Sequence, residues 1–297
     1  MEWFDKIYQA YKQQYADDYK EFYAHPAIAF IEPFKMADRL YYVGDKEVCV
    51  HLLETDEGLI LFDSGFFHTK HLLFESIRKL GFDPADVKWI LHTHEHYDHC
   101  GASDDFKRLY DTKLAISKEG ADALKKWPRR GIYEWGGANP YIAVPEFDYL
   151  LQDGEIFEFG GVKIRCVLTP GHAEGVMSFF FDVTDNGKTY LAGLFGGAGT
   201  YAMRLPDMLS MGVPLDMPQK MMQSLDLLEK EPVSVHLGNH PNNNETVEKR
   251  EKQLKEGGNP FVDNGESWNK FLGIIRGRTV DIIANNEQLM KTHNISV

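Results

Sequence analysis

The 297-residue sequence predicts an α/β protein in which two β-sheets pack face to face, with helices on their outer faces. Two observations support this fold class. Short β-rich runs occur in two separate blocks, and helical segments follow each block. No linker or change of composition divides the chain, so we expect one domain over residues 1–297.

The first block follows a segment with helical spacing. Aromatic and aliphatic residues recur at near-helical intervals and predict an amphipathic helix over residues 2–23. Turn signals GDK and DEG then separate three expected strands, near 39–43, 48–54 and 59–63. The segment KHLLFESIRKLGF predicts a helix that stops at Gly81. VKWILHT predicts a buried strand, and DDFKRLYDT, KLAIS and KEGADALKKW predict a helix, a strand and a helix.

Residues 128–150 are rich in glycine, proline and aromatic residues, which is typical of a long ordered loop over an active site. The second block then contains two hairpins, EIFEFGGVKIRCVLT and VMSFFFDVTDNGKTYLAG, and the latter has an Asn-Gly turn. A helix near 218–230 and the strand VSVHL follow. The C-terminal segment 244–297 is expected to be helical, with helices near 244–256 and 266–275.

The composition restricts the partners of the protein. Asp plus Glu outnumber Lys plus Arg by 45 to 32, which gives a formal charge of −13 and disfavours nucleic acids and anionic membranes. The sequence contains neither the apolar core of a signal peptide nor a membrane-spanning run, so a cytoplasmic location is expected. The three cysteines form no CxxC pair and are expected to be core thiols. The composition leaves the oligomeric state open.

The segment HTHEHYDHCG, residues 92–101, contains four histidines and an aspartate. Imidazoles and carboxylates are ligands that Zn²⁺ prefers. On an extended strand end, His94 and His96 point to the same side and can bind one metal. If the chain turns after them, Asp98 and His99 approach from another direction, which suits a second metal. His92 lies further back in the strand and is expected in the core or behind the ligands.

A short segment cannot complete two coordination spheres, so distant residues must contribute. TPGHAEG places His172 in a glycine-bounded loop directly after a strand, and VHLGNHPNNN places His240 in a similar position. We expect both to be metal ligands. His236 lies inside the apolar strand and is expected to pack in the core.

These motifs resemble the metallo-β-lactamase fold superfamily. LILFDSG resembles its strand-ending Asp-x-Gly, THEHYDHCG its Thr-His-x-His-x-Asp-His motif, and TPGHAEG its third histidine loop. The resemblance covers residues 32–240. It is greatest to the third subclass of metallo-β-lactamases, whose ligands are histidines and one aspartate.

The resemblance implies an αββα sandwich of two mixed sheets and a site with two Zn²⁺ ions per chain. His94, His96 and His172 would bind the first zinc, and Asp98, His99 and His240 the second. Asp63 would support the ligand loops. The implied function is hydrolysis of a β-lactam or related cyclic amide or ester by metal-bound hydroxide, with Asp98 as the catalytic residue that orients the nucleophile.

One departure from the superfamily pattern separates its branches. The sequence LAGLFGG has Leu194 where most hydrolases of the superfamily have an aspartate that bridges both metals. This difference argues against the glyoxalase, lactonase and phosphodiesterase branches. The loop over residues 194–199 also lacks the serines that bind the carboxylate of a β-lactam in the third subclass.

Two alternatives therefore remain open. One is a di-zinc hydrolase of a non-lactam ester, lactone or thioester; the other is an iron-binding redox protein or a non-catalytic metal-bound scaffold. The substrate is expected to be a small molecule. Four residues are candidates for contact with an anionic substrate, although each is also compatible with an ordinary surface or packing role: Arg129, Arg130, Tyr201 and Arg204.

Overall fold

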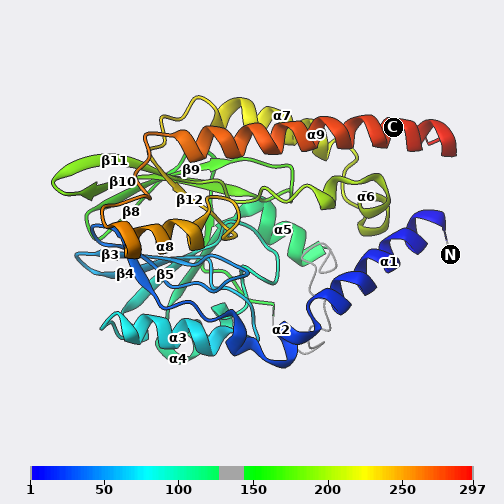
Figure 1. The fold of residues 1–297 in the computed structure, drawn as a ribbon. Helices are drawn as coiled ribbons and strands as arrows, with labels where there is room; N and C mark the ends of the chain where they lie inside the picture. The colour runs from blue at the N-terminus through cyan, green and yellow to red at the C-terminus, as the bar shows by residue number, and fades with distance from the viewer. Residues whose placement is uncertain (1, 127–143, 296–297) are drawn as a thin grey trace.

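A computed structural model describes residues 2–126 and 144–295 of the chain. Two β-sheets lie face to face, and helices cover both outer faces, as predicted (Figure 1). Helices α3 (Lys70–Lys79) and α4 (Ser103–Tyr110) cover the first sheet. Helices α7 (Met217–Leu228) and α9 (Glu266–His293) cover the second sheet. The fold is therefore an αββα sandwich.

The first sheet has seven strands in sequence order, and it is mixed. The strands up to β4 pair antiparallel, whereas β4 to β7 pair parallel. Parallel strands bring their carboxyl ends to one edge of the sheet, and the histidine-rich segment begins there, after β5. The strands are β1 (Phe34–Ala37), β2 (Leu40–Tyr42), β3 (His51–Thr55), β4 (Gly58–Phe62), β5 (Val87–Leu91), β6 (Lys113–Ser117) and β7 (Tyr149–Leu151).

The second sheet has five strands in the order β12-β11-β10-β9-β8. Its hairpin between β10 and β11 turns at Asn186 and Gly187, whose φ angles of 50° and 75° match the Asn-Gly turn predicted from the sequence. Strand β12 pairs parallel with β11, so residues that follow either strand lie at the same edge. The strands are β8 (Ile156–Phe159), β9 (Val162–Leu168), β10 (Met177–Asp185), β11 (Lys188–Leu194) and β12 (Val235–Leu237).

The main core lies between the sheets. Phe62 of the first sheet stacks on Phe181 of the second, with ring centroids 5.0 Å apart. Cys49, Cys100 and Cys166 are buried, as expected for core thiols, and none of the three forms a disulfide bond. No helix within the described ranges is both long and apolar enough to span a membrane.

The predicted single helix over residues 2–23 is wrong in one respect, because the structure divides it at Tyr19. Helix α1 (Trp3–Asp18) packs against α6 (Leu205–Met211), and α2 (Lys20–Ala24) follows it after Tyr19. Phe22 of α2 packs on Phe66, which follows β4, with ring centroids 5.2 Å apart. The two helices therefore have different packing partners, although the helical periodicity of the sequence is continuous.

The C-terminal segment contains α8 (Thr246–Glu256) and α9, and the predicted end of α9 near residue 275 is also wrong. The helix continues to His293, whose ring stacks on Trp3 with centroids 3.8 Å apart. Tertiary contacts therefore extend this helix through Asn285 and Asn286, which have low helix propensity.

The predicted loop over residues 128–150 lies mostly outside the described residues. Positions 128–143, which include Arg129 and Arg130, are not among them. The predicted end of the loop at residue 150 is wrong, because Tyr149 already begins strand β7. Within the described residues, the remaining helices are α5 (Lys118–Lys126) and short 3₁₀ turns at Pro26–Ala29, Pro84–Asp86 and Tyr201–Met203.

Candidate metal centre

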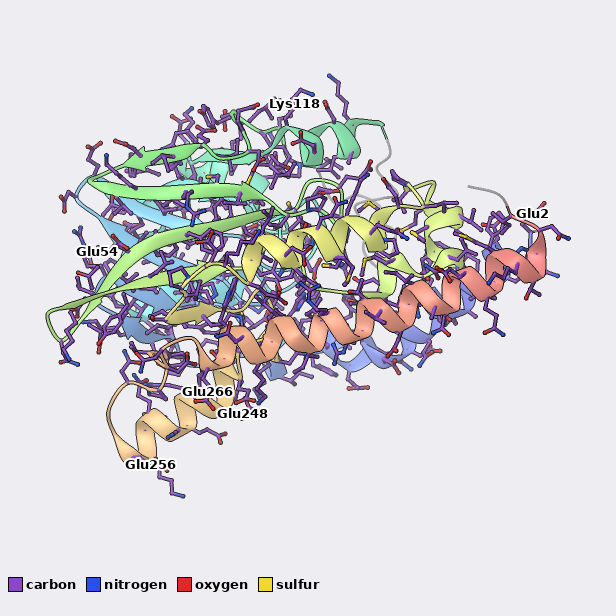
Figure 2. All side chains as sticks on the ribbon, turned by 90° about the horizontal axis from the view of Figure 1, so that it is seen from above. Glu2, Glu54, Lys118, Glu248, Glu256 and Glu266 are labelled. Carbon is purple, nitrogen blue, oxygen red and sulfur yellow. The ribbon has the colours of Figure 1, made fainter. Side chains whose placement is uncertain are left out.

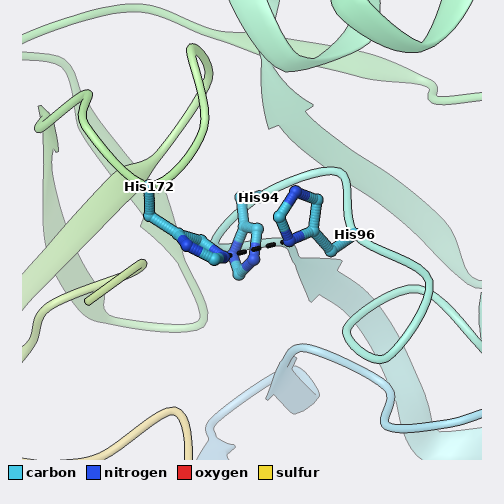
Figure 3. A group of neighbouring side chains, drawn as sticks. All are labelled: His94, His96 and His172. Atoms are coloured by element: carbon cyan, nitrogen blue, oxygen red, sulfur yellow. Dashed lines mark hydrogen bonds between the residues drawn. The ribbon is translucent and has the colours of Figure 1, made fainter. Parts of the chain in front are cut away.

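The structure gathers all six predicted ligands at the edge of the sandwich where β5, β9 and β12 end. They form two groups: His94, His96 and His172, and Asp98, His99 and His240. Within each group the candidate ligand atoms lie within 4.8 Å of one another. Figure 3 shows the ring of His172 reaching from a separate loop toward the other two members of its group.

Hydrogen bonds orient the imidazoles of the first group. The Nδ1 atom of His172 lies 2.7 Å from the carbonyl oxygen of Gly199, so it is the protonated nitrogen and Nε2 carries the lone pair. His94 donates from Nδ1 to the Thr93 hydroxyl at 3.0 Å, which leaves its Nε2 available. The lone-pair nitrogens of these two residues and of His96 therefore converge.

The same principle orients the second group. His99 donates from Nδ1 to the Asp63 carboxylate at 2.8 Å, and His240 donates from Nδ1 to the Glu47 carbonyl at 2.7 Å. Each residue therefore presents Nε2 to Asp98, whose Oδ2 lies 3.3 Å from His99 and 3.7 Å from His240. Such supporting partners fix the tautomer and orientation of metal-binding histidines.

The site keeps the first group neutral. Burial, and then repulsion between neighbouring imidazoles, lowers the pKa values of His94 and His96 well below the usual range. Burial also lowers the pKa of His172 to about 4. These three imidazoles are therefore unprotonated at neutral pH, which is the form that binds a metal.

The second group has a different electrostatic character. Burial opposes the charged form of His99, but Asp98 and Asp63 outweigh it and raise the pKa of His99 to about 10. Although burial acts in the other direction, His99 and His240 hold the pKa of Asp98 well below its usual range. Two carboxylates thus give this position an excess of negative charge that favours a cation.

Asp63 links the two groups from behind. It is buried, has a left-handed φ of 64°, and directly follows β4. Its carboxylate accepts hydrogen bonds from the Thr93 amide at 2.7 Å, the Thr93 hydroxyl at 2.8 Å and His99 Nδ1. One buried carboxylate therefore orients His99 directly and His94 through Thr93, as expected for a residue that supports the ligand loops.

The donor set fits divalent zinc. His94 Nε2 is buried and has no hydrogen-bond partner among the described residues, which is costly unless another group binds the lone pair. Each group offers three ligands and leaves a coordination position for water or substrate, as catalytic zinc sites do. The set contains nitrogen and oxygen donors without thiolate, which also agrees with zinc.

Other residues singled out in the sequence have structural roles. His92 is buried and uses both nitrogens, toward the Ala115 carbonyl and the Ser103 hydroxyl. His236 is buried between Trp268 and Phe271, as predicted.

Of the candidates for contact with an anionic substrate, Arg204 is engaged within the protein. It pairs with the buried Asp207 at 2.9 Å and lies 3.7 Å from the ring centroid of Tyr11. Tyr201 remains beside the site, with its ring 5.6 Å from that of His172.

The glycines after β11 have a steric explanation. A Cβ atom at Gly199 would lie 2.8 Å from the His172 ring, and one at Gly197 would lie 2.6 Å from Val176. Asn239, next to His240, donates to the carbonyl of Gly196 at 2.8 Å. The loop that lacks hydroxyl groups therefore lies closely around His172 and is hydrogen-bonded to the loop that carries His240.

A tyrosine cluster beside the ligand loop was missed in the sequence. The hydroxyl of Tyr97, between His96 and Asp98, lies 2.8 Å from that of Tyr15 in α1 and 2.7 Å from that of Tyr23 in α2. The N-terminal helices therefore contact the metal-binding segment directly. The sequence signal was the run of tyrosines in the first helix, but only the fold places it here.

The chain is similar to known proteins in sequence and in fold. The family model of the metallo-beta-lactamase superfamily matches residues 44–185. The native FEZ-1 metallo-β-lactamase from Legionella gormanii is 26% identical with a TM-score of 0.77, and the match covers 87% of this chain and 98% of FEZ-1. BJP-1, a subclass B3 metallo-β-lactamase of Bradyrhizobium japonicum, is 26% identical with a TM-score of 0.73, covering 90% and 97%.

Curated relatives match over shorter stretches. Glyoxylase B2 of Dictyostelium discoideum is 32% identical over 97 residues, which are 33% of this chain and 32% of the relative. The chain spans between 19% and 32% of the lengths of the first curated relatives that it matches. The family match includes the histidine-rich segment at residues 92–101. The structural match to FEZ-1 and BJP-1 covers 87% and 90% of the chain. Residues 44–185 therefore match the metallo-β-lactamase superfamily, and the fold of the chain is similar to that of subclass B3 metallo-β-lactamases.

Proposed function

We propose that the protein is a zinc-dependent hydrolase that opens a carbonyl group of a small molecule, a β-lactam or a related cyclic amide or ester. The observation that carries this proposal is the pair of complete ligand groups, in which distant hydrogen-bond partners direct the free nitrogens inward. Orientation of this kind is the mark of a preorganised metal site. We also propose that residues 1–297 form a single domain, because Trp3 stacks on His293.

The candidate residues would have two roles, metal binding and orientation of the attacking water. Zinc, when bound, lowers the pKa of coordinated water toward neutrality and polarises a carbonyl oxygen. His94, His96 and His172 would hold one ion, and Asp98, His99 and His240 the other. The Asp98 carboxylate would also accept a hydrogen bond from the attacking water and orient it toward the substrate. Its side chain is 15% exposed, so it remains accessible to a small molecule.

The substrate panel is the first test. The loop over residues 194–199 offers no hydroxyl to a substrate carboxylate, and a missing hydrogen bond to charge weakens binding by about ten- to a hundredfold. We therefore expect detectable but inefficient hydrolysis of carbapenems and a chromogenic cephalosporin, with a high KM and kcat/KM below about 10⁴ M⁻¹s⁻¹.

Steady-state rates on β-lactams, lactones and thioesters separate the alternatives. A kcat/KM near about 10⁶ M⁻¹s⁻¹ on a β-lactam would identify a dedicated β-lactamase and contradict the expected weakness. Faster turnover of a lactone or thioester would favour the non-lactam hydrolase. Stoichiometric iron with oxygen consumption, or metal binding without turnover of any member, would contradict hydrolysis.

A second expected result concerns a difference in affinity between the two metal sites. Leu194 stands where a bridging carboxylate would tie the sites together, and the His240 side chain is 36% exposed. The variant His240→Ala should therefore retain about one zinc per chain, while wild type retains two. Elemental analysis after dialysis measures this, with circular dichroism as the test of folding. Loss of both ions from a folded variant would show that the two groups are not independent.

A further inference from the structure

A cavity of about 640 Å³ opens beside the metal centre and continues between α8 and α9. His172 and His240, one from each ligand group, contribute to its wall, together with Tyr201. Its size is that of a site for a complete small molecule, larger than a reacting carbonyl needs. The cavity therefore has room for the part of the substrate beyond the scissile bond.

One face of α9 forms an apolar stretch of this cavity. Phe271, Ile274 and Ile275 line it at helical spacing, and Ile274 is 43% exposed. Exposed aliphatic side chains on the wall of a cavity favour an apolar occupant, because binding removes their surface from water.

Four of the charged residues along the cavity pair with one another. Lys249 pairs with Asp263 at 2.8 Å, and Lys270 pairs with Glu245 at 2.6 Å. Glu248 of α8 and Glu266 at the start of α9, both labelled in Figure 2, also line the cavity. Lys252 lies on α8, further along the helix than Glu248.

Arg278 differs from these residues in position. It follows Glu266 by twelve residues, which corresponds to about 18 Å along the helix axis. Further along α9, the Asn286 side chain donates to the Met203 carbonyl at 2.8 Å and accepts from the Leu205 amide at 2.8 Å. The part of α9 beyond Arg278 is thus fixed against the segment that follows Tyr201.

Arg278 also differs from its neighbour in pairing. Arg276 forms ion pairs with Asp226 and Glu229, at 2.7 and 2.8 Å. Arg278 has no ion pair with any described residue, although the chain carries a net charge of −13. Guanidinium binds a carboxylate through two parallel hydrogen bonds. A cation left unpaired on a cavity wall in so acidic a protein is available to an anionic ligand.

We propose that the α8–α9 groove binds the substrate outside its reacting carbonyl, with Arg278 holding a carboxylate and the Phe271–Ile275 face holding an apolar group. The substrate class is then an amide or ester that carries a carboxylate and an apolar substituent in addition to the scissile carbonyl. This inference rests on the proposed hydrolase function. It provides a carboxylate partner on α9 where the loop over residues 194–199 has none.

Binding of non-hydrolysable probes tests the groove separately from catalysis. Decyloxyacetate has the carboxylate and the apolar chain without a scissile bond, and decyloxyacetamide is its neutral counterpart. Calorimetry on the zinc-loaded protein should give a dissociation constant for the carboxylate about tenfold lower than for the amide. The same preference should persist after chelation of the metal, because the carboxylate is held by Arg278 and not by zinc.

Variants of α9 identify the residue responsible. Arg278→Gln should weaken decyloxyacetate binding about tenfold and leave decyloxyacetamide unchanged, whereas Arg278→Lys should retain part of the preference. Arg276→Gln is the matched control and should alter neither. Shortening the probe to butoxyacetate should weaken binding to wild type, and Ile274→Ser should reduce this dependence on chain length.

The outcomes separate this inference from the proposed function. Equal binding of both decyl probes, or equal binding by wild type and Arg278→Gln, would overturn the inference even if the protein hydrolyses β-lactams. Binding that depends on Arg278 in a protein that hydrolyses no member of the panel would support the groove and reject the hydrolase.

Discussion

Replacement of Asp63 by alanine is expected to lower the free energy of unfolding by about 3–5 kcal/mol and to abolish binding of the second metal. The buried carboxylate accepts hydrogen bonds from the Thr93 amide, the Thr93 hydroxyl and His99 Nδ1. Alanine leaves these donors without a partner inside the protein, and each unsatisfied donor costs about 1–3 kcal/mol. His99 also loses the contact that directs its Nε2 toward Asp98.

Two control variants isolate the cause. Asp111→Ala removes an aspartate with a similar left-handed φ of 56°, but its side chain is 91% exposed. It should cost only the backbone strain of alanine, about 1–2 kcal/mol. Asp63→Asn retains an acceptor for the Thr93 amide and should be intermediate.

Urea unfolding measures the stability of these variants, and zinc titration measures their metal binding. If Asp63→Ala matched Asp111→Ala in stability and still bound two zinc ions, Asp63 would have no supporting role.

Chelation of the metal is expected to abolish hydrolysis and to lower the melting temperature by about 10 °C. Three buried imidazoles are held neutral with converging nitrogens, and His94 Nε2 has no protein partner. A bound ion satisfies these groups in the folded state only. Binding at a thousandfold excess over the dissociation constant stabilises the folded protein by about 4 kcal/mol per site.

Elemental analysis of the purified protein should give up to two zinc ions per chain. Restoring zinc should recover both activity and melting temperature. His25→Ala changes an exposed histidine away from the candidate ligands and should leave metal content unchanged, whereas His94→Ala should lose the first ion. Stoichiometric iron, or an unchanged melting temperature after complete removal of the metal, would contradict the zinc site.

The sequence by itself determined the αββα fold class and the residues that converge. The proximity of His94, His96 and His99 is local, because the three residues lie within six positions of the loop that follows β5; the expected strand end at His94 and His96 is wrong, since β5 ends at Leu91. His172 and His240 were recognisable because each follows a strand directly, and strand ends meet at a sheet edge. The hairpin at Asn186-Gly187 was likewise fixed by local turn chemistry.

Only the tertiary structure decided which nitrogen atoms of the candidate ligands face one another and which residues surround them. The free nitrogen of His172 depends on the Gly199 carbonyl, and that of His240 on the Glu47 carbonyl 193 residues away. Helix α9 extends to His293 because Asn286 and His293 find partners in distant segments. Arg204 is engaged by Asp207, whereas Arg278, which no motif marks, faces the cavity. Periodicity specifies the near neighbours of a residue, but hydrogen bonds and ion pairs between distant segments form only once the sheets have packed.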